Sequence, residues 1–316
     1  MQGNTYMIKA FIQAARLRTL PLSVSGIIVG ASLGNLEYEC FIKPGFNCCF
    51  GNPHVFTSLI FWLAILTTIS LQILSNFAND YGDGIKGTDS NRQGEKRLVA
   101  SGIISANLMK RAVIITAIIT FLLALCLIYI AFKANFIYAI LFIILGVISI
   151  IAAIKYTVGK NAYGYSGLGD LFVFLFFGLL STVGSYFLYT KYINGMVFLP
   201  ASTIGLLSAA VLNLNNMRDR IEDAKHNKIT LAVKLGNQGA KIYHYMLIGL
   251  ALIFALTYVF LNYNNSKQFL FLIAFIPLAR NIIVVAKNSI NRDLDPELKK
   301  VALSTFLFAI LFSIFN

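Results

Sequence analysis

Two short stretches of the sequence combine amide and carboxylate side chains at spacings that suit cation binding. They are residues 79–89 (NDYGDGIKGTD) and residues 216–223 (NMRDRIED). In each stretch an amide lies three or four residues from an aspartate, and two aspartates are also three or four residues apart, so that a helix would place them on one face. Like charges at this spacing repel each other, and close carboxylates raise one another's pKa unless a cation lies between them. Both stretches therefore predict a bound cation.

The carboxylate and amide oxygens of these stretches favour Mg²⁺. Proteins hold this ion with a few carboxylates, and substrate phosphates and water complete its coordination. Two such clusters facing each other could bind a diphosphate through shared Mg²⁺ ions, which would neutralise the charge of a diphosphate leaving group. One cluster alone would more often be helix caps and loop charges, but the repetition favours a metal site. The expected metal ligands are Asn79, Asp80, Asp83, Asp89, Asn216, Asp219 and Asp223, with Asp83, Asp219 and Asp223 as the catalytic centre.

Other polar residues near these stretches are candidates for substrate contacts. Basic side chains could bind phosphate directly, and those near the clusters are Arg97, Lys225 and Lys228. Candidates for binding a second substrate are Arg16, Arg18, Tyr156 and Asp170. The first three are equally typical of residues that anchor a helix at a membrane surface. Asp170 is an ionisable group at a membrane edge, and such a group is by default a functional candidate.

The elements that must position these residues are membrane-spanning helices. The chain of 316 residues is 58% hydrophobic and 12% charged, whereas about a quarter of the residues in soluble domains are charged. No small-residue cleavage site follows the basic N-terminal residues. Segments of about 20 apolar residues are expected to be helices because an open sheet cannot satisfy its backbone in lipid. Nine qualify: residues 18–36, 55–78, 109–132, 135–156, 168–190, 196–217, 241–262, 267–289 and 298–315.

The distribution of Lys and Arg gives the orientation of these helices. The N-terminal segment has three, each odd-numbered connection has one, and the even-numbered connections have six, two, six and five. Basic connections stay on the cytoplasmic side, so we expect a cytoplasmic N-terminus, an external C-terminus and both acidic stretches at the cytoplasmic face. This rule also explains the net charge of +13 without nucleic acid as a partner, for which the sequence has no motif.

The glycines and cysteines complete the local predictions. Gly84 and Gly87 are expected to end the helix soon after Asp83, so that Asp89 points back from a loop. Cys40, Cys48 and Cys49 share the first connection, where a disulfide, a metal site and free thiols all remain open.

Several motifs together resemble the UbiA superfamily of intramembrane aromatic prenyltransferases, and within it the menaquinone branch of 1,4-dihydroxy-2-naphthoate polyprenyltransferases. The motifs are RLRTLPLS, LQILSNFANDYGDGIKGTD, IIAAIKYTVG, YGYSGLGD and NNMRDRIEDAKHNKITLAVKLG. The five residues between Asp83 and Asp89 match the menaquinone branch, since ubiquinone-branch members have a shorter gap. The connection around residues 37–53 is longer than is usual for the family, but it lies on the side away from the acids.

The resemblance implies an all-α, polytopic fold: a single domain over residues 1–316, with nine transmembrane helices around a central cavity that cytoplasmic acidic loops cap. One acidic motif would lie in each of two pseudo-halves. It implies Mg²⁺, a polyprenyl diphosphate donor, 1,4-dihydroxy-2-naphthoate as acceptor, and membrane lipid around the protein in a bacterial inner membrane. The product would be demethylmenaquinone, formed with loss of the acceptor carboxylate as CO₂.

Two alternatives to this reading remain. The acceptor could be another ring, such as 4-hydroxybenzoate, homogentisate or haem. Alternatively, the protein could be a cation-coupled transporter, in which acidic residues are expected near the middle of the bilayer in interrupted helices.

Overall fold

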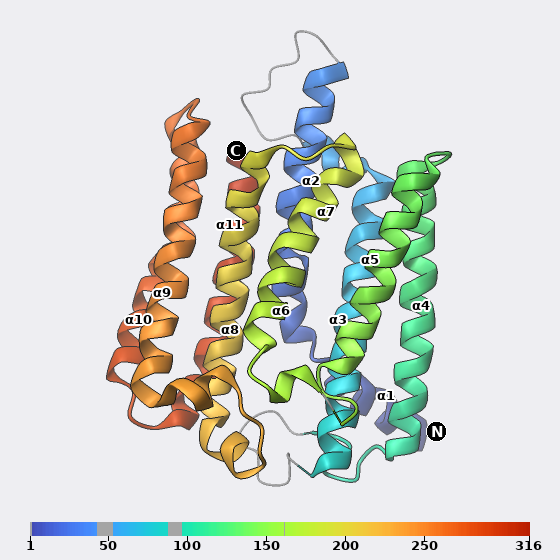
Figure 1. Ribbon diagram of the computed structural model, residues 1–316, viewed down its shortest axis with the longest axis vertical. Coiled ribbons are helices and arrows are strands. Elements are labelled where there is room, and N and C mark those ends of the chain that lie inside the picture. The colour runs from blue at the N-terminus through green and yellow to red at the C-terminus, as the bar shows by residue number, and fades with distance from the viewer. Residues whose placement is uncertain (1, 43–52, 88–96, 161) are drawn as a thin grey trace.

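The computed structural model describes residues 2–42, 53–87, 97–160 and 162–316, and every regular element within these ranges is a helix. Nine helices or helix runs in the described part of the chain are long and apolar enough to cross a membrane. They stand side by side as one bundle (Figure 1). The predicted all-α, nine-span architecture is therefore confirmed.

The spans have the following bounds. The first four are α2 (Leu20–Ile42), α3 (Leu59–Lys86), α4 (Ala106–Phe132) and α5 (Phe136–Lys155). The fifth joins α6 (Gly169–Val173), a π-helical segment (Phe174–Leu180) and α7 (Ser181–Thr190). The last four are α8 (Phe198–Lys225), α9 (Leu231–Leu261), a 3₁₀ segment (Ser266–Ala274) with α10 (Phe275–Lys287), and α11 (Asp295–Phe315). Outside the spans lie α1 (Gln2–Ala15) and short 3₁₀ turns at Leu17–Thr19, Pro53–Thr57, Tyr163–Tyr165, Gly195–Val197 and Asn291–Leu294.

The helices that carry the acidic stretches are longer than the apolar segments predicted. Both α3 and α8 continue beyond the predicted ends at residues 78 and 217, to Lys86 and Lys225. Hydropathy marks the hydrocarbon region, whereas the helical hydrogen bonds continue into the polar zone. Gly84 does not end α3, contrary to the prediction. A Cβ atom at Gly84 would lie 2.7 Å from Cγ1 of Val99, so this glycine allows close packing, and the helix ends at Gly87, whose φ of 71° is left-handed.

The connections separate into two sets at opposite ends of the bundle (Figure 1). The α1 helix and the connections that follow α3, α5, α8 and α10 lie at one end. The connections that follow α4, α7 and α9 lie at the other end, as does the C-terminus. The Lys- and Arg-rich connections therefore share one end, as the alternation of charge predicted.

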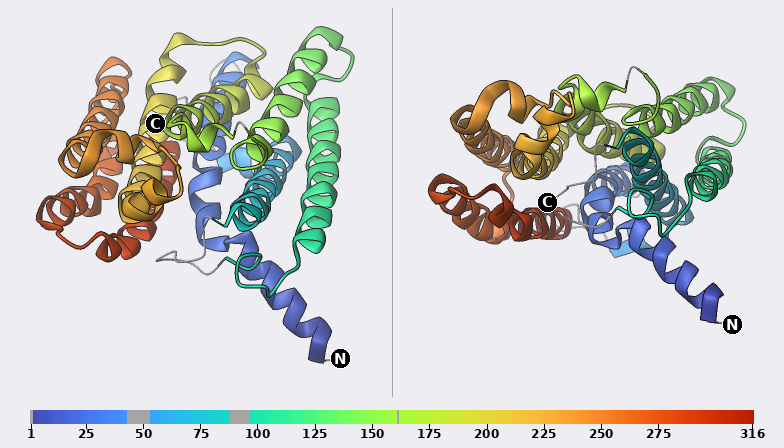
Figure 2. Two further views of the ribbon diagram at one scale, coloured as in Figure 1. Left: turned by 60° about the horizontal axis from the view of Figure 1, so that its bottom comes forward. Right: turned by 90° about the horizontal axis from the view of Figure 1, so that it is seen from below.

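Packing differs between the inner and outer helices. α2 is largely buried and packs against α3, α7 and α11, while α4 and α5 form an outer edge with many exposed apolar side chains, mostly Ile. Figure 2 shows this edge from two further directions. An exposed apolar face of this size on a membrane-spanning bundle is the surface that lipid covers.

Candidate active site at one end of the bundle

The two acidic motifs meet at a polar cavity of about 180 Å³ near the basic end of the bundle. Asn79 and Asp83 of α3 line it, and so do Asn215 and Asn216 of α8. Six basic side chains line the same cavity: Arg16, Arg18, Arg97, Arg218, Lys228 and Lys299. A cavity with this many cations around a few oxygen ligands suits a strongly anionic group such as a diphosphate.

Asp83 is buried at the centre of the first motif, with a 2% exposed side chain. The hydroxyl of Tyr165 donates to its Oδ1 at 2.7 Å, and the guanidinium of Arg97 lies 3.4 Å from its Oδ2. The ammonium group of Lys228 stands 5.5 Å from the ring centre of Tyr165, and the amide of Ile229 donates to the carbonyl of Tyr165. Tyr165 therefore joins the first motif to the segment that follows the second.

The aspartates of the second motif are also paired with basic side chains. Arg218 forms a bidentate ion pair with Asp219, in which Nε and Nη2 donate to the two carboxylate oxygens at 2.7 Å each. The ammonium group of Lys228 lies 3.5 Å from Oδ1 of Asp223. Both carboxylates lie beside cavity-lining cations rather than on the cavity wall itself.

Asp80 has a different place from the one predicted. Its carboxylate does not line the cavity, and its two oxygens accept hydrogen bonds from the backbone amides of Leu98 and Val99, each at 3.1 Å. Asp80 is only 1% exposed. The expectation that Asp80 is a metal ligand is therefore not supported. Its carboxylate instead holds the turn that begins at Arg97.

Two further predicted residues that the structure describes are not brought to the cavity. The side chain of Lys225 is 62% exposed and pairs with Glu222 at 2.7 Å, because it points away from the motif face of α8. Asp170 is buried at the start of α6 near Tyr243, but it lines neither the polar cavity nor the apolar cavity described below. Asp89 lies outside the described residues.

The residues at the polar cavity fit a divalent cation by the chemistry of their donor atoms. Asn79, Asp83 and Asn216 offer carboxylate and amide oxygens, which hard cations such as Mg²⁺ prefer. Within the part of the chain that the structure describes, however, no three His, Cys, Asp or Glu side chains form a group that could hold a metal. The aspartates of both motifs lie against Arg and Lys, so a cation that enters must compete with these side chains.

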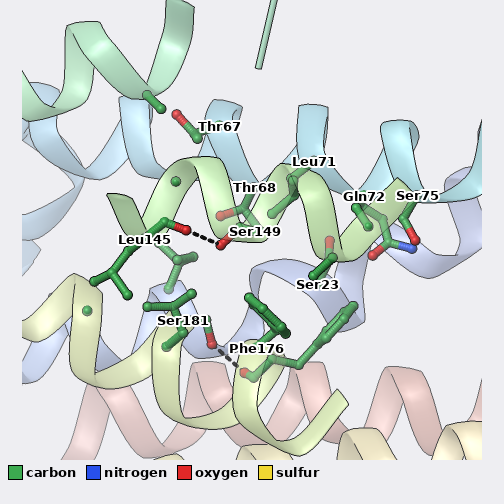
Figure 3. Close-up of a pocket in the computed structure, with 18 of the residues that line it drawn as sticks. Ser23, Thr67, Thr68, Leu71, Gln72, Ser75, Leu145, Ser149, Phe176 and Ser181 are labelled. Carbon is green, nitrogen blue, oxygen red and sulfur yellow. Dashed lines mark hydrogen bonds between the residues drawn. The ribbon is translucent and has the colours of Figure 1, made fainter. Parts of the chain in front are cut away.

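A second, apolar cavity of about 340 Å³ adjoins the polar one and extends into the membrane-spanning part of the bundle. Several Ser and Thr side chains line it (Figure 3). Many of their hydroxyls donate to carbonyls of their own helices: Thr67 donates to Leu63 at 2.7 Å, and Ser149 donates to Leu145 at 2.8 Å. Because such hydroxyls are already satisfied, the wall behaves as an apolar surface, and its small residues leave room for a chain of hydrocarbon.

The two cavities share six residues, which mark the boundary between polar and apolar space: Gln72, Asn79, Tyr156, Val173, Phe177 and Leu212. Burial, together with the nearby Asp170, raises the pKa of Tyr156 well above its usual range. An amphiphilic substrate can place its charged group in one cavity and its apolar chain in the other.

Sequence reasoning missed some residues that the structure places at the site. Tyr165 lies in the quoted motif YGYSGLGD, but its bond to Asp83 depends on the fold. Arg218 adjoins Asp219 in sequence, but adjacency alone does not show that the two side chains form an ion pair. Asp295 and Lys299 come from α11, and no pattern in the sequence linked that helix to the motifs.

The acidic motifs lie at one end of the bundle rather than near its middle (Figure 1). An ion pathway through the bilayer would require acids at mid-depth. The geometry therefore favours a site at the membrane surface over a transporter.

Comparisons with known proteins agree with this arrangement. A model of the UbiA prenyltransferase family matches residues 45–311. A 1,4-dihydroxy-2-naphthoate octaprenyltransferase from Haemophilus influenzae is 40% identical over 97% of this chain and 95% of its own length. An enzyme of the same name from Escherichia coli is 39% identical over 91% of this chain and 87% of its own. A UbiA homolog from Archaeoglobus fulgidus, solved with GPP and Mg²⁺, has the same fold, with a TM-score of 0.62 at 17% identity over 96% of this chain and 99% of that one. The chain therefore belongs to the UbiA prenyltransferase family.

Proposed function

We propose that this membrane protein transfers a polyprenyl group from polyprenyl diphosphate to 1,4-dihydroxy-2-naphthoate, with loss of the acceptor carboxylate as CO₂, in menaquinone biosynthesis. The observation that carries the proposal is the pair of adjoining cavities. One is polar and lined by both acidic motifs and six cations, and the other is apolar and reaches into the bundle. Two relatives that are 39% and 40% identical over most of the chain carry the name of this activity.

The donor fits with its diphosphate in the polar cavity and its prenyl chain in the apolar one. Arg97, Arg218 and Lys228 would hold the phosphate oxygens through charge-assisted hydrogen bonds. The first allylic carbon then lies at the boundary of the cavities. When the C–O bond breaks, its electron pair leaves with the diphosphate, and the cations stabilise the charge that develops there.

The positive charge that develops on the allylic carbon is held where the wall is aromatic. Phe177 and Tyr156 both lie at the boundary between the cavities, and aromatic faces attract cations. The apolar cavity beyond them excludes water, which would otherwise capture the allylic group.

The acceptor carboxylate would pair with Arg16 or Arg18 at the side of the polar cavity nearest the N-terminus. Both arginines line this cavity, and Arg16 is held in a left-handed conformation with a φ of 50°. The electron-rich ring would then attack the allylic carbon. The C–CO₂ bond breaks as the C–C bond forms, and its electron pair returns to the ring.

We expect Mg²⁺ to bind at the same cavity. The residues that would hold it are Asn79, Asp83 and Asn216 on the cavity wall, together with Asp219 and Asp223, whose carboxylates lie beside the wall and would have to leave their basic partners. Asp89 is a further candidate from the sequence. When bound, Mg²⁺ would supply additional positive charge that neutralises the departing diphosphate.

The test uses membranes that contain the protein, polyprenyl diphosphates of several lengths, Mg²⁺ and either 1,4-dihydroxy-2-naphthoate or 4-hydroxybenzoate, with products identified by mass. We expect prenylated product with the naphthoate as acceptor and none with 4-hydroxybenzoate. Asp83→Ala and Asp219→Ala should each lower the Mg²⁺-dependent rate by at least about 100-fold while the protein still inserts. Full activity of either variant would contradict the metal assignment, and product from hydroxybenzoate alone would contradict the acceptor.

The polar cavity is proposed to face the cytoplasm of a bacterial inner membrane. The Lys and Arg count supports this orientation, and so does Cys40, which is disulfide-bonded at the end of α2 opposite the acidic motifs. Structural disulfides persist in oxidising compartments such as the periplasm. A C-terminal alkaline phosphatase fusion should be active and a C-terminal green fluorescent protein fusion dark; the reverse result would invert the orientation.

A further inference from the structure

Asp295, the first residue of α11, contacts the second acidic motif although it lies 77 residues away from Arg218 in sequence. Nη1 of Arg218 donates to Oδ1 of Asp295 at 2.5 Å. Nη1 of Arg18 stands 4.0 Å from Oδ2 of the same carboxylate. An acid at this position is also favourable for the helix, because Asp295 and Pro296 occupy its N-terminal turn. Asp295 therefore joins α11, the second motif and an arginine of the N-terminal segment.

Arg218 lies between two carboxylates. Its Nε and Nη2 atoms donate to Asp219, while Nη1 on the other edge of the guanidinium donates to Asp295 and Nη2 also donates to Asn215 at 2.8 Å. The Arg218 side chain is 1% exposed, whereas the Asp295 side chain is 36% exposed. A planar guanidinium can hold two carboxylates in this way because its donors point to different sides.

We propose that Asp295 is a positioning residue, which holds Arg218 at the wall of the polar cavity while Asp219 exchanges this arginine for a divalent cation. The proposal rests on the function proposed above, in which a cation and a diphosphate share the cavity. Asp219 forms a bidentate pair with Arg218, so the two must separate, at least in part, for the Asp219 oxygens to face a cation. Asp295 then continues to balance the charge of Arg218, whose released donors can turn to a phosphate oxygen.

The pairing predicts the direction of the effect when Asp295 loses its charge. In Asp295→Asn the guanidinium of Arg218 keeps Asp219 as a charged partner but loses the competing one, so the Arg218–Asp219 pair tightens. A cation must then break a stronger pair to bind. Replacing Arg218 with glutamine removes the competitor, so that the charge of Asp295 no longer matters through this route.

The experiment measures Mn²⁺ binding by electron paramagnetic resonance on the purified full-length protein in detergent, with inorganic pyrophosphate present. We expect Asp295→Asn to raise the Mn²⁺ concentration at half-saturation about three- to tenfold. In the Arg218→Gln background the same substitution should change it less than twofold. Asp295→Glu should restore binding close to the wild-type value, and Asp293→Asn serves as the control, since Asp293 is exposed nearby and does not line the cavity.

The outcomes separate a positioning role from other roles. An unchanged half-saturation in Asp295→Asn would overturn the proposal while leaving the proposed function intact, because the wild-type protein still binds Mn²⁺ and transfers the prenyl group. An equal rise in both backgrounds would also overturn it, since it would show only a through-space charge effect. If the wild-type protein binds no Mn²⁺ at all, the proposed metal site and the role of Asp295 both fail. Should Asp295→Asn not fold, Asp295→Ser removes the same charge and carries the same expectations.

Discussion

Three aspartates of the two motifs each have a basic neighbour. Asp83 lies beside Arg97, Asp219 beside Arg218, and Asp223 beside Lys228. These ion pairs offset the repulsion that closely spaced carboxylates would otherwise suffer. All three basic residues line the polar cavity. We infer that the same side chains compensate the aspartates before substrate binds and contact the diphosphate afterwards.

Asp80 provides a prediction at the residue scale. Asp80→Asn keeps the shape of the side chain but places an amide group against a backbone N–H, so one of the two hydrogen bonds to residues 98 and 99 is lost. We expect the free energy of unfolding to fall by about 1–3 kcal/mol. Because the turn that it holds carries Arg97, the KM for polyprenyl diphosphate should rise while the Mg²⁺ requirement stays the same. Thermal unfolding in detergent and steady-state kinetics measure the two effects.

Asp83→Asn is the matched comparison for this prediction, since Asp83 lies on the same helix and lines the cavity. It should raise the Mg²⁺ requirement. A raised Mg²⁺ requirement in Asp80→Asn, with unchanged stability, would show that Asp80 is a metal ligand after all.

The residue types of the site could be predicted from the sequence, but not all of their roles. The i,i+3 and i,i+4 spacings correctly placed Asn79 and Asp83 together on α3, because helical geometry is local. The same reasoning could not show that Asp80 points to the turn at residues 98–99, or that Asp295 reaches Arg218. Both contacts depend on how distant segments pack, which spacing alone does not encode.

At the scale of the helices, the α2–α7 contact shows how closely the backbones approach. Gly26, Gly30 and Gly34 recur every four residues along one face of α2, which is the small-residue pattern of close helix pairs in membranes. A Cβ atom at Gly30 would lie 2.0 Å from the carbonyl oxygen of Thr182. Since that neighbour is backbone, it cannot move aside without displacing α7.

We therefore predict that Gly30→Val destabilises the protein by about 2–3 kcal/mol or more, because overpacking forces the helices apart. The melting temperature in detergent reports the effect. Gly249→Val on α9 is the control, because a Cβ atom there meets nothing within 4 Å. Equal melting temperatures for the two variants would show that α2 and α7 do not pack as closely as described.

The number of spans was predictable, whereas the ends of several helices were not. Each crossing of the bilayer needs about 20 apolar residues, and basic connections stay on one side of it, so these two features together give the number of spans. They carry no information on where a helix ends in the polar zone. There α3 continues past Gly84, which packs closely against Val99, and the helix stops only at Gly87.

At the scale of the whole molecule, the polar and the apolar space of the site form two separate cavities. The polar cavity lies at the basic end of the bundle, and the apolar cavity extends from it between α3, α5, α6 and α7. Only the six residues at their boundary line both cavities. Substitutions deep in the apolar cavity should therefore change which donor chain is accepted without changing the chemistry at the diphosphate.

Gly184 on α7 tests this separation. It lines the apolar cavity, and a Cβ atom there would meet only Cδ1 of Leu180, at 3.8 Å, so a larger side chain can extend into the cavity without straining the helix. We expect Gly184→Leu to favour shorter polyprenyl diphosphates, with kcat/KM for the longest donor falling about tenfold or more relative to geranyl diphosphate. The Mg²⁺ requirement and the KM for the acceptor should stay as in the wild type, because no boundary residue has changed. Competition between donors of two lengths, with products identified by mass, measures the preference, and Gly249→Leu controls for adding a leucine to a span. If Gly184→Leu lowers the rates of all donors equally, or raises the Mg²⁺ requirement, the two cavities do not act independently and the prenyl chain takes another path.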